Sequence, residues 1–185
     1  INGTGGLTAN ENFTVNGILN LQNVNPSATK GLLDITDPYE LIMGPNSTND
    51  GGGDVTGIIT RNTIIDNHTY TFGNKNTSLS FYPGATSLPD YMKLKVVIGN
   101  DPWGTGTINR VYELILSNGV NYLATFRAFY LDSELNGNVE DDLSFWAATH
   151  PFTNPIDNAK SNSNTTENWV EISDFDLDYL PSTFG

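Results

Sequence analysis

The sequence predicts an all-β protein, and two observations carry that prediction. Apolar residues alternate with polar ones over short segments, and turns rich in Asn, Gly, Pro and Asp separate these segments. With 185 residues, of which 37% are hydrophobic, the chain is long enough to bury a substantial core. We therefore expect an antiparallel β-sandwich, of jelly-roll or immunoglobulin-like type, over residues 61–185. A short-stranded, solenoid-like β segment is expected before it, over residues 1–60.

Short strands are predicted in the first 60 residues. The apolar positions that share one parity there are Phe13, Val15, Leu19, Leu21, Tyr39, Leu41, Met43, Val55 and Ile59. Turn sequences lie between them at 15–17 (VNG) and 45–54 (PNSTNDGGGD), because Asn and Gly tolerate positive φ. We interpret the glycine-rich part as a flexible surface loop, since three glycines pre-organise nothing for a bound cation.

Longer strands are predicted in the second part. Their inward-facing residues are Tyr70, Phe72, Leu79, Phe81, Met92, Leu94, Val96, Ile98, Tyr112, Leu114 and Leu116. The segment 121–131 (NYLATFRAFYL) is apolar on both faces, which suits the middle of a sandwich sheet. Near the end the parity changes between Ile172 and Phe175. One extra residue near Ser173–Asp174, in a β-bulge or a turn, would restore a single apolar face.

The charge and the cysteine count exclude several classes of protein. There are 8 Lys and Arg against 21 Asp and Glu, a formal net charge of −13, so nucleic acid and anionic membranes are poor partners. After Arg127 the only Lys or Arg is Lys160. A carboxylate-rich half of this kind is typical of proteins that work in a calcium-rich extracellular medium. The absence of cysteine excludes disulfides and a Cys nucleophile. No apolar run reaches the length of a membrane span, and without a starting Met or an export signal we expect a processed or excised piece.

Several strings resemble a known family. TGIITR, TYTFGN, LKVVIG, INRVYEL and ATFRAFYLDSELNGNVEDDLSFW, within about 60–146, resemble a β module of large, secreted, adhesin-like proteins of Bacteroidetes-type bacteria. YLDSELNGN at 130–138 is the most specific part, and FTVNGILNL at 13–21 is similar to the parallel-β repeats that often precede such modules. The resemblance implies an extracellular or cell-surface setting, often reached by type IX secretion, and no particular mechanism. No type IX sorting domain is visible in the sequence.

The string DSELNG at 132–137 resembles the first half of an oxygen-ligand calcium loop. Alternate residues converge when the chain curls around an ion, and the glycine allows the bend. Leu143 occupies the twelfth position, where such a loop carries a bidentate Glu, so carboxylates further along would have to complete the site. The candidate ligands are Asp132, Glu134, Asn136, Asn138, Asp141 and Asp142. The alternative is a solvated acidic turn between two strands.

Trp103 marks a candidate carbohydrate site. It lies in NDPWGTG at 100–106, a loop context for a residue that normally prefers burial. Exposed loop aromatics stack on sugar rings, and the neighbouring Asn100 and Asp101 are suited to bond hydroxyl groups. The alternative is that Trp103 covers one end of the core.

The sequence offers no catalytic constellation, and we predict that the chain is not an enzyme. His68 and His150 lack paired-ligand spacing, and no nucleophile elbow, zinc-protease or phosphate-loop motif is present. The expected function is a non-catalytic structural and adhesive module of an extracellular or cell-surface bacterial protein. The alternatives are a carbohydrate-binding module and a calcium-stabilised β-sandwich of a secreted hydrolase. The second rests on the many carboxylates of the chain, because a glycosidase needs only a pair of them.

The expected partners are other copies or neighbouring modules of the same surface protein, and polysaccharide. Residues 1–22 alternate cleanly, and a strand there is able to complete a neighbouring subunit's sheet, because an open edge pairs with any matching strand. Pairing within its own chain is the alternative.

Overall fold

The structure is a computed structural model that describes residues 6–22, 31–82, 87–99, 106–119, 123–149, 153–157, 159–176 and 183–184. Strands dominate it, and the described residues contain no α-helix and two short 3-10 turns, so the predicted all-β fold is confirmed. No helix among these residues is long and apolar enough to cross a membrane.

Within the described residues, seventeen strands follow one another. The short early strands are β1 (Leu7–Ala9), β2 (Phe13–Val15), β3 (Ile18–Asn20), β4 (Leu32–Ile35), β5 (Glu40–Met43) and β6 (Thr48–Asp50). The later strands are β7 (Asp54–Arg61), β8 (Thr69–Phe72), β9 (Asn74–Phe81), β10 (Tyr91–Ile98), β11 (Arg110–Ser117), β12 (Leu123–Phe129), β13 (Trp146–Thr149), β14 (Thr153–Asp157), β15 (Asn162–Asn164), β16 (Trp169–Asp176) and β17 (Thr183–Phe184). The two 3-10 turns are η1 (Asp132–Glu134) and η2 (Glu140–Asp142).

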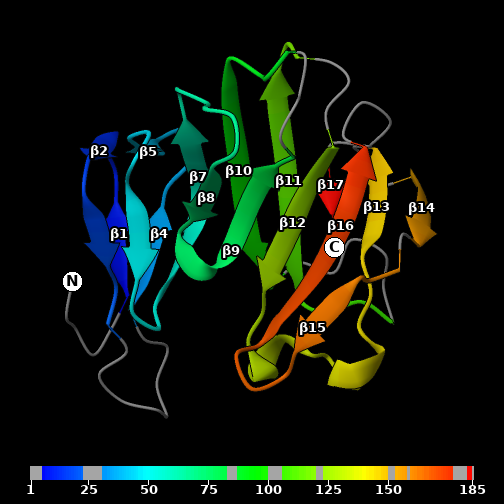
Figure 1. Cartoon of the computed structure of the whole chain (residues 1–185). Helices are drawn as coiled ribbons and strands as arrows, with labels where there is room; N and C mark the ends of the chain where they lie inside the picture. The colour runs from blue at the N-terminus through cyan, green and yellow to red at the C-terminus, as the bar shows by residue number, and fades with distance from the viewer. Residues whose placement is uncertain are drawn as a thin grey trace.

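The first six strands form two stacked rungs of a parallel solenoid. β1 pairs with β4, β2 with β5 and β3 with β6, and every one of these ladders is parallel. The register sets Leu7 opposite Leu33 and Phe13 opposite Leu41, so apolar residues of successive rungs lie in columns. Figure 1 shows these blue and cyan strands together at one end of the molecule. The solenoid-like segment expected from the alternation is therefore present.

Strand β7 joins the solenoid to the sandwich. Its first half pairs in parallel with β4, and its second half pairs in parallel with β5 and antiparallel with β10. The strand changes partners at Gly57, where φ is +87° and a Cβ would lie 2.2 Å from the carbonyl oxygen of Ile35. Only glycine fits this close approach at positive φ. The boundary predicted between residues 60 and 61 lies inside β7, which belongs to both parts.

Two sheets make up the rest of the fold. One sheet continues from β7 through β10, β11, β17 and β13 to β14, and the other has the order β15-β16-β12-β9-β8. Their inner faces meet in one core that also contains the solenoid's apolar residues, Leu33, Leu41 and Val55 among them. The predicted irregularity in β16 is confirmed as a bulge, because the register with β12 shifts between Ile172 and Phe175 and Asp174 adopts φ +55°.

The glycine-rich turn at 51–53 is a packed corner rather than a projecting loop. Gly53 is buried, and a Cβ there would lie 2.5 Å from the carbonyl oxygen of Gly31 in the rung beneath. Gly51 has φ +83° and would place a Cβ 2.4 Å from the carbonyl oxygen of Leu21. The glycines let successive rungs stack closely where the chain passes from β6 to β7, which the sequence interpretation of a flexible loop missed.

Candidate functional site

Arg110, at the start of β11, is the centre of a buried ion cluster. Its Nε donates to Glu134 Oε2 at 2.7 Å and its Nη2 donates to Glu134 Oε1 at 3.0 Å, which makes a two-pronged pair. Nη2 also donates to Asp54 Oδ2 at 2.6 Å. The cluster therefore ties three parts of the chain together: β11, the η1 turn and the start of β7.

The cluster is almost dry. The side chain of Arg110 is 0% exposed, those of Asp54 and Glu134 are 8% and 4% exposed, and the guanidinium lies 5.4 Å from the Phe129 ring. Burial alone lowers the pKa of Arg110, but Asp54, Tyr112 and Glu134 outweigh it and raise that pKa well above the ordinary value. The arginine stays charged at any ordinary pH, so the cluster is suited to holding strands in place.

A groove of about 960 Å³ lies on one side of this cluster. It opens where β7 leaves β10: their ladder ends at Gly57 and Val96, whereas β10 continues beside β11 as far as Ile98. Polar side chains on its walls include Asp37, Lys95, Asn109, Asp132, Ser133 and Asn168. None of the described lining residues is aromatic. The volume falls in the range of about 300–1,000 Å³ that is usual for ligand sites.

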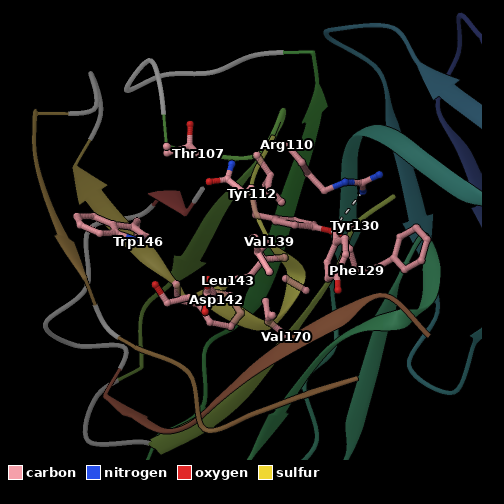
Figure 2. A pocket seen from close by; sticks show the side chains of 16 residues that line it. Thr107, Arg110, Tyr112, Phe129, Tyr130, Val139, Asp142, Leu143, Trp146 and Val170 are labelled. Carbon is pink, nitrogen blue, oxygen red and sulfur yellow. Dashed lines mark hydrogen bonds between the residues drawn. The ribbon is translucent and has the colours of Figure 1, made fainter. Parts of the chain in front are cut away.

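A second, much smaller cavity of about 80 Å³ is lined in part by Arg110 and shares no lining residue with the groove. Figure 2 shows Arg110 and Tyr130 at one end of it and Trp146 at the other. Tyr112 lines it as well, donating its hydroxyl to the Phe129 carbonyl oxygen at 2.5 Å while that hydroxyl accepts from Arg110 Nη1 at 3.2 Å. The cavity is too small for a sugar ring, and its polar end belongs to the ion cluster.

The structure separates the two acidic groups at the start of the candidate calcium loop. Glu134 turns inward to Arg110, whereas Asp132 is exposed and accepts a hydrogen bond from Asn168 Nδ2. The carboxylate of Glu134 also accepts from the Leu131 peptide N–H at 3.0 Å, which closes the η1 turn. The string DSELNG therefore forms a turn whose glutamate serves the Arg110 cluster.

The remaining candidate ligands lie further along the same turns. Asn136 Nδ2 donates to the Thr107 carbonyl oxygen at 3.2 Å, and Asn138 Nδ2 donates to the Leu135 carbonyl oxygen at 2.8 Å. Asp141 and Asp142 are exposed in η2. Among the described residues no group of three or more Asp, Glu or His side chains is placed to hold a metal ion. A calcium site here stays a prediction.

The candidate carbohydrate residues Asn100, Asp101 and Trp103 lie outside the described residues, as does His150. His68 is half-buried, and its ring contacts Tyr70 at a centroid distance of 4.6 Å. Within the described part of the chain, no nucleophile, base and orienting group are brought together.

Arg61, at the end of β7, is a second buried arginine that the sequence analysis missed. It is 0% exposed, and its Nη1 donates to the carbonyl oxygens of Gly44 and Ser47 at 2.7 and 3.0 Å. Its Nη2 donates to the Thr71 carbonyl oxygen at 2.5 Å. Burial lowers its pKa to about 10, and no ion pair to Arg61 is present among the described residues. It joins the second solenoid rung to the β8 strand of the sandwich.

Both arginines carry a signal in the sequence. Arg61 has the parity of the inward-facing Val55 and Ile59, and Arg110 has the parity of Tyr112 and Leu114. A charged residue that continues an inward-facing row at a strand end points to a buried polar contact. Comparison with known proteins adds nothing further, since no protein-family model, curated protein or solved structure matches the chain significantly.

Proposed function

We propose that the chain is a non-catalytic structural and adhesive module of an extracellular or cell-surface bacterial protein. The observation that carries the proposal is the shared strand β7, through which a parallel solenoid and a β-sandwich become one body with one core. Solenoid rungs stack on their neighbours, and a terminal unit with a different surface closes such a stack. The sandwich occupies that position next to the second rung.

Two buried arginines support a structural role for this junction. Arg61 bonds the β5–β6 turn to β8, and Arg110 bonds the start of β7 to β11 and η1. Each reaches across the border between solenoid and sandwich. Because a buried charge that loses its partners is strongly destabilising, these contacts resist separation of the two parts.

The proposal is tested by adhesion and turnover measurements on the same preparation. Beads coated with the chain are expected to be retained on polysaccharide surfaces or on surfaces coated with the chain itself, and panels of glycans and peptides are expected to stay uncleaved. Turnover of any glycan or peptide that disappears in Asp132→Ala or Asp37→Ala would contradict the proposal. So would a lack of retention on every surface.

A carbohydrate-binding function is the second candidate, and the groove favours it. Lys95 Nζ lies 3.4 Å from Asp37 Oδ2, and Asp132 pairs with Asn168, so donors and acceptors are held in place along the walls. Such paired polar groups suit neutral hydroxyls better than a strongly charged ligand. Affinity electrophoresis in soluble polysaccharides is expected to show retardation that weakens in Asn168→Ala and Trp103→Ala. The control is Lys75→Ala, which changes an exposed residue that does not line the groove.

Calcium binding by the 132–142 region is tested by thermal unfolding. A melting temperature that rises in calcium, falls in EDTA and loses this response in Asp132→Ala would support a site. Binding to the folded state alone adds about 2.7 kcal/mol at a hundredfold excess over Kd. Equal melting temperatures in calcium and EDTA would contradict a calcium site and support the alternative interpretation of this region as a solvated acidic turn.

A further inference from the structure

The outer edge of the first solenoid rung is an unpaired surface of the described fold. We use the term rung edge for the outward sides of β1, β2 and β3. Each of these strands pairs on one side only, with β4, β5 and β6 respectively, and no other described strand lies on the opposite side. Three short rows of peptide groups therefore face outward together, at the blue end of the molecule in Figure 1.

The rung edge lacks the features that normally prevent strand edges from pairing. Natural edge strands carry charged residues, prolines or bulges that block association. The nine residues of β1, β2 and β3 read LTA, FTV and ILN, with no charge and no proline. Among the described residues, no strand covers this edge on any of the three faces of the solenoid.

The apolar columns of the solenoid also end at this surface. Leu33 is 1% exposed, but Leu7, its partner in the first rung, is 46% exposed. Phe13 is only half-buried, whereas Leu41 opposite it is 0% exposed. Ile18 adds a side chain that is 68% exposed. Covering these side chains would remove apolar area from water, which favours association.

We propose that two copies of this chain associate through the rung edge, an inference that rests on the proposed structural function and names its partner. An edge related to its own copy by a two-fold axis is self-complementary, since antiparallel strands exchange N–H and C=O bonds symmetrically. The distribution of charge favours association at this end. The chain has a formal net charge of −13, but Glu11 is the only charged residue in 6–22. Two acidic copies meet least repulsion where their surfaces are nearly neutral.

The dimer is expected to be of moderate strength. Three strands of three residues each form a small contact compared with stable complexes, which bury roughly 1,200–2,000 Å². The dimer should therefore dissociate on dilution. Salt should strengthen it, because screening weakens the repulsion between the acidic remainders of the two copies.

The test is sedimentation or light scattering of the whole chain over a range of concentrations. The parent is expected to shift from monomer to dimer. Thr8→Lys/Thr14→Lys places two guarding charges on exposed positions of the rung edge and should raise the dissociation constant at least tenfold. The control Thr165→Lys/Thr166→Lys makes the same charge change on an exposed turn of the sandwich and should leave the dimer intact. Both variants lower the net negative charge equally. Loss of the dimer in Thr8→Lys/Thr14→Lys alone would therefore show that the rung edge forms the contact.

Ile18→Lys provides a second variant that keeps the test decisive if the double variant misfolds. Ile18 is 68% exposed and adds little to its own core, so this variant should fold like the parent and lose the dimer. A parent that stays monomeric at every concentration overturns the inference. So does a dimer indifferent to changes at Thr8, Thr14 and Ile18, or an open-ended series of oligomers. Adhesion retained by a monomer would still leave the proposed function standing.

Discussion

The guanidinium of Arg110 and the carboxylate of Glu134 form a two-pronged ion pair, 2.7 and 3.0 Å long, between groups that are 0% and 4% exposed. Asp54 joins the pair from the first residue of β7. The DSELNG turn is thereby attached to the strand that links solenoid and sandwich. Its glutamate has a structural task that explains why an acidic residue lies in that turn.

Arg110→Met is expected to lower the free energy of unfolding by about 3–5 kcal/mol, because it leaves the buried carboxylates of Asp54 and Glu134 without a cation. Urea unfolding followed by tryptophan fluorescence measures the change. Lys75→Met is the control, since the side chains of Lys75 and Glu167 lie 4.0 Å apart and are 47% and 48% exposed. Exposed pairs contribute about 0–1 kcal/mol. Equal losses in the two variants would contradict the role given to the Arg110 cluster.

Gly57→Ala is expected to destabilise the junction by more than about 2 kcal/mol. An alanine at φ +87° is strained, and its Cβ would lie 2.2 Å from the Ile35 carbonyl oxygen, which is backbone and cannot move freely. Gly17→Ala is the control, because nothing lies within 4 Å of a Cβ there. A compatible Gly→Ala change raises stability by about 0.4–1 kcal/mol. If Gly57→Ala unfolds at the same urea concentration as the parent, Gly57 does not approach the Ile35 carbonyl as closely as described.

Alkaline pH is expected to destabilise the fold through its buried tyrosines. Burial raises the pKa of Tyr70 and of Tyr130, and raises that of Tyr112 to about 12, from an ordinary value of 10.0. A raised pKa in the folded state contributes stability that is complete below pH 10 and is lost as the pH rises toward about 12. Arg61, whose pKa burial lowers to about 10, acts in the opposite direction, but three tyrosines outweigh it.

Tyrosinate absorbance during a pH titration checks this expectation. Tyr112 should ionise only well above the ordinary pKa of 10.0, together with unfolding. Tyr112→Phe should reduce this late step. Ionisation of all eight tyrosines in a single step near pH 10 would show that these side chains are solvated.

Alternation in the sequence predicts most of the inward-facing residues, including Leu41, Ile59, Leu94 and Phe81, because one sheet face is buried almost everywhere. The bulge near Asp174 was readable for the same reason. The partners of Arg110 were not, since Asp54 lies 56 residues away and no local spacing connects the two. Alternation also does not distinguish parallel from antiparallel pairing, so β7 as a strand with both kinds of neighbour emerges only from the three-dimensional structure.

Residue-resolved hydrogen exchange under native conditions tests most directly whether solenoid and sandwich form one structural unit. The account predicts that the slowest amides of β4 and β5 exchange with the same free energy of opening as those of β10 and β12, because β7 and one core connect them. It also predicts that Arg110→Met lowers both sets together. Exchange of β4 and β5 at a free energy several kcal/mol below that of β10 and β12 would contradict it, since the solenoid would then open independently of the sandwich.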